Sequence, residues 1–259
     1  MQMKVTVLGG SAAGGNTGAG CSGYLAQTDG ASFVLDFGPG ILLELRKHAD
    51  FRSLDAIVIS HLHLDHTLDL GALRFALAYN PVKTDRRIPL WMPPGGRAFL
   101  DAFGAAFAES PDEHDFFTRV FDIAEYDPSG TITIGDAHVT FARTVHYIPC
   151  WAMRVHAGNE GDFFYTADTG PAADLVAFAR GCRVIAAESG TLDGAGETFE
   201  ERGHLTPNEA GSLATAIGAG TLILTHLWEE YGFETYRERA ASTFNGKLEI
   251  AHPGLIVEW

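Results

Sequence analysis

Cysteine is scarce in this sequence. The chain of 259 residues has three cysteines, and no two of them form a Cys-x-x-Cys pair. An odd, scattered set excludes the disulfide framework of small secreted domains and fits a reducing compartment. We therefore expect the thiols to lie buried as small apolar side chains; they belong to Cys21, Cys150 and Cys182.

Long apolar runs are missing as well. No stretch reaches the roughly 18 to 20 apolar residues that a membrane-spanning helix needs. The first residues lead straight into the strand-like segment Val5–Leu8, whereas a secretion signal needs a basic start, a long apolar stretch and a cleavage site. These absences predict a cytoplasmic protein that does not act at a membrane.

The sequence contains few positively charged residues. Eighteen lysine and arginine residues stand against 33 aspartate and glutamate residues, which gives a formal net charge of −15 at pH 7. A protein that grips a long polyanion normally presents clustered cations that displace counterions from the phosphates. We therefore expect no long nucleic acid as a partner. With 46% hydrophobic residues a sizeable core is available, and we expect residues 1–259 to form a single domain.

Two familiar motifs are incomplete. The glycine-rich stretch from Gly9 to Gly20 has no Gly-Lys-Ser/Thr ending, and a strand-like segment follows it where a P-loop or a Rossmann turn requires a helix. This stretch can be a substrate-facing loop or a structural one. Asp168-Thr169-Gly170 matches an aspartic protease motif, but that chemistry needs two such carboxylates, and the chain has no second Asp-Thr/Ser-Gly.

The most informative stretch is Ser60-His61-Leu62-His63-Leu64-Asp65-His66, which places four potential metal ligands within six positions. It follows the apolar run Ala56–Ile59, which is typical of a buried strand. The first two histidines point to the same side of an extended chain, and the chain must then turn to bring Asp65 and His66 beside them. Imidazole and carboxylate without thiolate favour zinc, manganese or iron, and this geometry suits two ions better than one. The alternative is a polar surface turn with chance histidines.

The rest of the chain alternates strands with single helices. Periodicity predicts strands over 4–8, 21–27, 32–36, 56–59, 88–92, 120–123, 131–134, 138–144, 151–155, 163–166, 184–187, 222–224, 248–251 and 255–258. It predicts helices over 41–48, 68–78, 96–108, 172–179, 207–217 and 233–243, and Thr206-Pro207-Asn208-Glu209 caps the fifth of them. Two similar β-rich halves with helices outside predict an α/β fold, a four-layer αβ/βα sandwich.

A centre with two ions needs more ligands than the central motif provides, and residues at strand ends can be aimed by a rigid sheet. Three candidates follow predicted strands: His146, Asp168 and His226. The Asp168 carboxylate can bridge two ions. Taken alone, His146 is more typical of a structural histidine.

The motif and its downstream spacing resemble the signature of the metallo-β-lactamase superfamily, and in particular the branch that contains ribonuclease Z and bacterial cyclic-nucleotide phosphodiesterases. The resemblance runs over nearly the whole chain. It implies the αβ/βα sandwich and two divalent metal ions, with zinc expected first and manganese or iron as alternatives. It assigns seven ligands, with His61, His63 and His146 on one metal, Asp65, His66 and His226 on the other, and Asp168 between them.

The same branch carries a Glu and His pair outside the metal shell, which the resemblance places at Glu188 and His204. The alternative interpretation is that Glu188 is a surface carboxylate and that His204 is a residue at the start of a helix. Superfamily hydrolases that act on lactams, lactones or thioesters do not generally carry the pair. In the implied mechanism a metal-bridging hydroxide attacks phosphorus, Asp65 orients it, and His204, polarised by Glu188, protonates the departing alkoxide.

The chain departs from ribonuclease Z at two places. Only residues 147–167 separate His146 from Asp168, too few for a long tRNA-gripping arm, and residues 16–20 contain no lysine or arginine where a basic loop is expected. We therefore expect a metal-dependent phosphodiesterase whose partner is a small, cyclic nucleotide-like phosphodiester, and we leave a homodimer open. The alternatives are a ribonuclease Z-like endoribonuclease, a lactonase- or thioesterase-type ester hydrolase, and a non-catalytic regulator.

Overall fold

Two seven-stranded sheets form the centre of the protein in the computed structural model, which describes residues 3–107 and 115–259. The first sheet has the order β14-β1-β2-β3-β4-β5-β6. Its strands are β1 Lys4–Gly9, β2 Gly23–Gln27, β3 Ser32–Leu35, β4 Ala56–Val58, β5 Ile88–Met92, β6 Phe121–Glu125 and β14 Ile256–Glu258. The second sheet has the order β13-β12-β11-β10-β9-β8-β7. Its strands are β7 Thr131–Ile134, β8 Ala137–Arg143, β9 Trp151–His156, β10 Phe163–Tyr165, β11 Val184–Glu188, β12 Thr221–Thr225 and β13 Lys247–Ile250.

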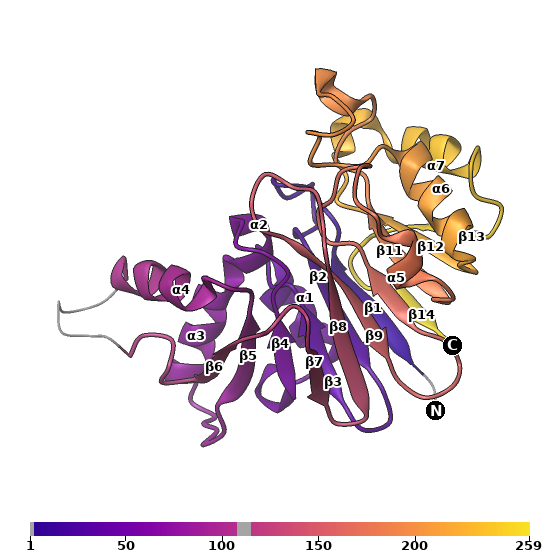
Figure 1. Cartoon of the computed structure of the whole chain (residues 1–259). Helices are drawn as coiled ribbons and strands as arrows, with labels where there is room; N and C mark the ends of the chain where they lie inside the picture. The colour runs from indigo at the N-terminus through magenta and orange to yellow at the C-terminus, as the bar shows by residue number, and fades with distance from the viewer. Residues whose placement is uncertain (1–2, 108–114) are drawn as a thin grey trace.

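Helices cover the outer faces of both sheets. Figure 1 shows α3 and α4 on one side of the molecule and α5, α6 and α7 on the other, with the sheets between them. The helices are α1 Ile41–His48, α2 Leu64–Thr67, α3 Asp69–Tyr79, α4 Gly96–Ala105, α5 Val176–Ala179, α6 Pro207–Ile217 and α7 Phe233–Ala241. This arrangement is the predicted αβ/βα sandwich.

Successive residues of the central strands enter different apolar cores, because side chains alternate between the two faces of a strand. In β3, Phe33 packs between the sheets and Val34 packs under the helices of the first sheet. In β10, Phe163 packs between the sheets and Phe164 packs under the helices of the second. Strands buried on both faces read as continuous apolar runs, which is why the sequence marks them clearly.

The parallel strands place several loops at one edge of the sandwich. Strands β3, β4, β5 and β6 are parallel neighbours, and so are β10, β11, β12 and β13. The carboxyl ends of parallel strands lie at the same edge of a sheet, and ligands of open α/β sheets bind there. The segments that follow β4, β10, β11 and β12 carry most of the predicted site residues.

A few expectations about local structure need correction. The helix predicted over 172–179 begins only at Val176, because the backbone before it makes other hydrogen bonds: Gly170 N–H donates to Val145 O, and Ala173 N–H donates to Gly170 O. The helix predicted over 96–108 ends at Ala105, and Ala108 lies outside the described residues. The three cysteines are buried and free, as expected. Among the described residues, no helix is long and apolar enough to cross a membrane.

Candidate metal centre

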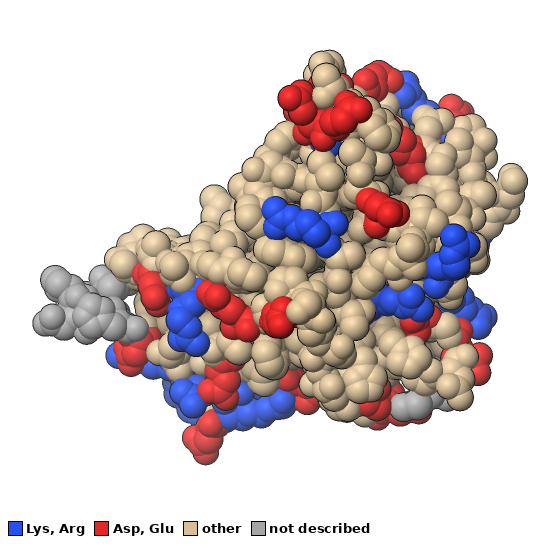
Figure 2. Space-filling view, viewed as in Figure 1, with Lys and Arg blue, Asp and Glu red and all other residues tan. Residues whose placement is uncertain are grey.

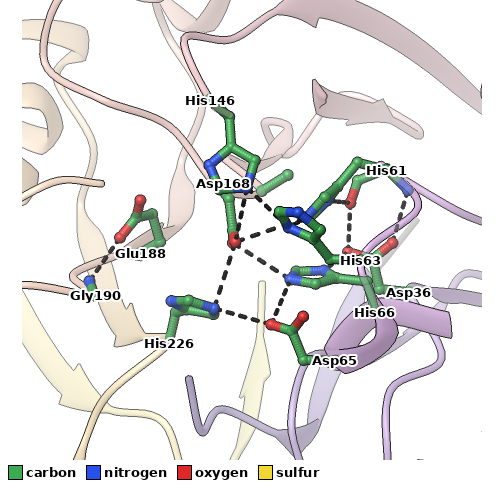
Figure 3. Close-up of polar contacts among 12 residues, drawn as sticks. Asp36, His61, His63, Asp65, His66, His146, Asp168, Glu188, Gly190 and His226 are labelled. Atoms are coloured by element: carbon green, nitrogen blue, oxygen red, sulfur yellow. Dashed lines mark hydrogen bonds and ion pairs between the residues drawn. The ribbon is translucent and has the colours of Figure 1, made fainter. Parts of the chain in front are cut away.

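The predicted site residues converge from both sheets at the edge where the parallel strands end (Figure 3). His61 and His63 follow β4, and Asp65 and His66 lie in α2, the short helix that turns the chain back. From the second sheet, His146 follows β8, Asp168 follows β10 and His226 follows β12. The side chains form two groups that share Asp168, called cluster A and cluster B below.

Cluster A consists of His61, His63, His146 and Asp168, whose nearest donor atoms all lie within 4.8 Å of one another. Nδ1 of His63 is 3.2 Å from Nε2 of His61 and 3.0 Å from Nε2 of His146. Oδ2 of Asp168 lies 3.7 Å from Nε2 of both His61 and His146. Three imidazoles and one carboxylate therefore face a common point.

Cluster B consists of Asp65, His66, His226 and Asp168. Oδ2 of Asp65 is 3.2 Å from Nε2 of His66 and 3.2 Å from Nε2 of His226. Asp168 presents Oδ1 to His66 at 3.4 Å and Oδ2 to His226 at 3.4 Å. Asp168 thus faces the histidines of both clusters, which is the position that a bridging carboxylate requires.

Hydrogen bonds outside the clusters fix which nitrogen of each imidazole points inward. The Ser60 hydroxyl donates to Oδ2 of Asp36 at 2.7 Å, so its oxygen must accept from Nδ1–H of His61, 2.9 Å away. Nδ1–H of His66 donates to Asp36 at 2.7 Å, and Nδ1–H of His146 donates to Gly203 O at 2.9 Å. Nε2 of each of the three rings therefore faces the cluster, the arrangement found in metal-binding histidines.

The two clusters fit divalent metal ions. In cluster A the inward lone pairs of His61 and His146 both face Nδ1 of His63, which can carry only one proton. In cluster B the carboxylates of Asp65 and Asp168 bring two negative charges together at His66, and within the described residues Nε2 of His66 and Oδ1 of Asp168 have no hydrogen-bond partner. A positive ion relieves this repulsion. Ligand nitrogens of a tetrahedral zinc site lie about 3.3 Å apart, given Zn–N bonds of about 2.0–2.1 Å, close to the spacings in cluster A.

Burial and charge set the protonation states of the clusters. Burial holds the pKa of His61 well below its usual value and lowers the pKa of His63 and His146, so these imidazoles stay neutral, as metal ligands must be. Burial opposes protonation of His66, but the charges of Asp168 and Asp36 outweigh it and raise its pKa. The negative field that raises the pKa of His66 also attracts a metal cation.

Asp36 is a site residue that the sequence analysis missed. Its side chain is fully buried and joins several parts of the centre. Oδ2 accepts from His66 Nδ1, Ser60 Oγ and Tyr165 Oη at 2.7, 2.7 and 2.8 Å, and Oδ1 accepts from Ser60 N–H at 2.7 Å. Asp36 therefore orients two cluster histidines, His66 directly and His61 through Ser60. Its one sequence signal is a carboxylate at the end of a buried apolar strand.

Backbone strain marks the segments that carry the centre. Asp36, Ala167 and His226 have φ values of 58°, 49° and 58°, in the left-handed region that non-glycine residues rarely adopt. Such residues persist where surrounding contacts enforce them, and they gather at functional sites. Part of this support comes from the glycine-rich stretch, because Asn16 Nδ2 donates to Leu227 O at 2.9 Å, next to His226. That stretch therefore has at least a structural role.

Glu188 is buried, with 1% of its surface exposed, so the alternative interpretation of Glu188 as a surface carboxylate is wrong. It ends β11, and Oε1 accepts backbone N–H groups from Thr169 at 3.0 Å and Leu205 at 3.2 Å. Oε2 accepts the N–H of Gly190 at 2.7 Å. These amides hold the carboxylate in one orientation behind the clusters.

His204 completes the predicted pair. Its Nδ1 lies 3.0 Å from Oε1 of Glu188, and its ring stacks on His226 with the ring centroids 5.2 Å apart and the planes 17° apart. Burial lowers the pKa of His204, but the charge of Glu188 and the hydrogen bond to it outweigh burial and raise the pKa to about 9. The imidazole is therefore protonated near neutral pH, beside the ligand cluster.

Comparison with known sequences supports the resemblance. Residues 32–227 match the sequence model of the β-lactamase superfamily domain. The chain is 31% identical over 258 residues to the probable metallo-hydrolase YhfI of Bacillus subtilis, a match that covers 99% of this chain and 100% of YhfI. It is 26% identical to a ribonuclease Z of Streptomyces avermitilis, with 89% of each chain covered.

Solved structures show the same fold. The crystal structure of YhfI matches with a TM-score of 0.86 and 28% identity over the whole of both chains. A diphosphatase from the PhnP family matches with a TM-score of 0.75 and 20% identity over 99% of this chain and 98% of that one. The chain therefore belongs to the metallo-β-lactamase superfamily of metallo-hydrolases.

Proposed function

We propose that this hydrolase is a phosphodiesterase that uses two divalent metal ions, zinc in the first place, to cleave a small phosphodiester such as a cyclic nucleotide. The observation that carries the proposal is the contact between Glu188 and His204, 3.0 Å between Oε1 and Nδ1, beside two clusters of metal-ligand type. A protonated imidazole at this place matches the main difficulty of phosphodiester cleavage, which is the departure of a poor alkoxide leaving group.

The clusters would hold one ion each, with Asp168 shared. His61, His63 and His146 supply the remaining ligands of cluster A, and Asp65, His66 and His226 supply those of cluster B. Two bound ions supply a water of lowered pKa and stabilise negative charge on a phosphoryl oxygen. The protein fixes the positions of the ligands through Asp36, Ser60 and the carbonyl of Gly203.

His204 would act as the general acid. Nδ1 is engaged by Glu188, so Nε2 is the atom that can deliver a proton to the leaving oxygen. General acid catalysis of this kind contributes roughly 10²–10⁴-fold to the rate. Glu188 holds the ring in one orientation and stabilises the imidazolium, and it is in turn fixed by the backbone amides around it.

Asp65 has a second task in addition to metal binding. A hydrogen bond from His226 and the positive charge of His66 outweigh burial and hold the pKa of the Asp65 carboxyl well below its usual value. Asp65 is therefore ionised and faces the space between the clusters. It can accept a hydrogen bond from the attacking water and orient it toward phosphorus.

A small substrate fits the surroundings of the site. Figure 2 shows acidic side chains gathered at the top of this face, over the segment that Figure 1 draws in orange. This segment lies between the proposed catalytic residues Glu188 and His204, and its exposed acidic residues are Asp193, Glu197, Glu200 and Glu201. A polyanion would be repelled there. Residues 147–167 contribute only β9, β10 and their connections, so no long arm stands between His146 and Asp168.

A ribonuclease Z-like activity is the second candidate. Its support is the match to the Streptomyces ribonuclease Z over 89% of both chains. The acidic segment beside the site and the net charge of −15 count against it. A lactonase- or thioesterase-type activity has less support, because superfamily hydrolases of those classes do not generally carry a Glu and His pair such as Glu188 and His204.

A substrate panel tests the proposal. The metal-loaded protein would be assayed with cyclic mononucleotides, bis-p-nitrophenyl phosphate, precursor tRNA and a series of lactones. We expect kcat/KM for a cyclic mononucleotide or for the aryl phosphodiester to exceed that for precursor tRNA. Efficient processing of precursor tRNA at physiological salt would reverse the order of the two phosphodiesterase candidates, and turnover of lactones alone would exclude both.

A further inference from the structure

Tyr147 is a large aromatic residue that stays exposed at the edge of the metal centre. It directly follows the predicted ligand His146, and 54% of its surface is open to solvent. Its ring centroid lies 5.0 Å from that of His146 and 5.7 Å from that of His204. The ring therefore lies beside both cluster A and the proposed general acid, although more than half of the residue's surface is open to solvent.

The ring of Tyr147 is held in place. Its hydroxyl donates to the Glu197 carboxylate, at 2.8 Å from Oε2 and 3.0 Å from Oε1. The backbone of Gly203 packs so closely against the ring that a Cβ there would lie 2.8 Å from Cε2 and Cζ. A glycine and a hydrogen bond thus fix the orientation of the ring, while the remaining surface stays free. A fixed aromatic surface loses little conformational entropy when it binds a planar group.

The distance from the clusters suits the structure of a cyclic nucleotide. The two ester oxygens of such a molecule belong to one ribose, and the base is attached to the same ribose. A base therefore lies about one sugar ring away from the phosphorus. Tyr147 lies at a similar separation from the clusters, where the phosphorus would bind. Its ring centroid is 5.0 Å from that of His146, whose Nε2 faces cluster A.

We propose that Tyr147 determines substrate specificity by stacking on the planar base of the phosphodiester, an inference that rests on the proposed phosphodiesterase activity. Every base has an aromatic face, so stacking favours base-bearing substrates without selecting one base. Tyr147 would strengthen binding of a cyclic nucleotide and would contribute nothing to a cyclic sugar phosphate that lacks a base.

The hydrogen bond from Tyr147 to Glu197, called the clamp below, also holds the segment that leads to His204. A test must separate this effect from stacking. The hydroxyl holds Glu197, next to a turn in which Gly194, Ala195 and Gly196 all have positive φ values of 74°, 51° and 78°. Loss of the clamp would disturb His204 and slow every substrate alike. Loss of stacking would slow only substrates with a base.

The experiment compares two substrates in matched variants. Adenosine 3′,5′-cyclic monophosphate and the 3′,5′-cyclic phosphate of methyl riboside, which lacks the base, would be assayed with Tyr147→Leu, Tyr147→Phe and wild-type enzyme. Tyr147→Leu should lower the ratio of the two kcat/KM values roughly 5- to 150-fold, mainly through KM. Tyr147→Phe keeps the ring and removes the clamp, so the ratio should stay within about twofold. Tyr79→Leu, which removes a ring with 56% exposure on α3, serves as the control and should leave both values unchanged.

Product binding gives a readout that does not depend on turnover. Calorimetry should show weaker binding of adenosine 5′-monophosphate to Tyr147→Leu and unchanged binding of ribose 5-phosphate. An equal loss of kcat/KM on both cyclic substrates in Tyr147→Leu, with unchanged nucleotide binding, would overturn the stacking role and leave only the clamp. If wild-type enzyme hydrolyses the base-free compound but Tyr147→Leu keeps the wild-type ratio, the stacking role fails while the proposed function stands. Hydrolysis of neither cyclic compound by the wild type overturns the stacking role, and the proposed function falls as well if bis-p-nitrophenyl phosphate is not hydrolysed either.

Discussion

Oδ2 of Asp36 lies 2.7 Å from Nδ1 of His66, although the two residues follow different strands of the first sheet. The same carboxylate holds Ser60, which in turn orients His61. One buried side chain therefore fixes a histidine in each cluster. Such outer partners of metal ligands set ring orientation and ligand basicity.

Replacement of Asp36 should weaken both metal sites. Asp36→Asn keeps the size of the side chain but removes the charge, and we expect a loss of roughly 10- to 100-fold in metal affinity. Competition titration with a chromophoric chelator measures this loss. Asp29→Asn, at an exposed position, is the matched control. Wild-type affinity in Asp36→Asn would show that Asp36 supports the fold and not the ligands.

Asp168→Ala should reduce the occupancy of both metal sites, since the carboxylate faces the histidines of both clusters at 3.4–3.7 Å. His63→Ala is the comparison, because His63 belongs to cluster A alone. This variant should bind about one ion fewer per protein molecule than the wild type. Elemental analysis of the purified variants gives the metal-to-protein ratio. Full occupancy of two ions in Asp168→Ala is the result that excludes a bridging role.

Removal of the metals should destabilise the protein. Without cations, inward lone pairs repel one another in cluster A, and the carboxylates of Asp65 and Asp168 repel one another in cluster B. A ligand that binds only the folded state adds about 2.7 kcal/mol at a concentration of 100 Kd. Thermal unfolding should therefore shift to lower temperature after dialysis against a chelator and recover when zinc is restored. An unchanged Tm would mean that the clusters are stable without metal.

The pH dependence of turnover should report the Glu188–His204 contact. The charge of Glu188 outweighs the effect of burial and raises the pKa of His204 to about 9. The acid must be protonated to act, so kcat should fall as the pH rises through this pKa. Glu188→Gln removes the charge and lowers the pKa, and the descending limb of the kcat profile should move to lower pH. If the descending limb of Glu188→Gln stays at the pH of the wild type, the pH dependence of kcat does not arise from His204.

The sequence predicted the sandwich because its central strands are buried on both faces and are therefore visible as short apolar runs, such as Ala56–Ile59. It also indicated the candidate ligands, which directly follow such runs. The division of seven ligands between two clusters came from the family resemblance, and the side chains converge in that division.

Other features depend on tertiary contacts that a local sequence pattern does not show. The contacts of Asp36 depend on β3 and β4 ending at the same edge, which is a property of the sheet and not of any local motif. The positive φ values of Ala167 and His226 are uncommon for residues other than glycine and persist where surrounding contacts enforce them. The helix predicted from Ala172 starts late because Gly170 bonds to Val145, a contact between segments far apart in the sequence.

The most direct test of the account is the dependence of His204→Ala on the leaving group. If His204 donates a proton to the departing oxygen, this variant should keep its metal content and its fold. It should lose roughly 10²–10⁴-fold in turnover of a phosphodiester with an alkoxide leaving group. The loss should be much smaller with bis-p-nitrophenyl phosphate, because p-nitrophenolate departs without a proton. An equal loss on both substrates would contradict the account, since His204 would then bind the phosphate or the metal instead of acting as the acid.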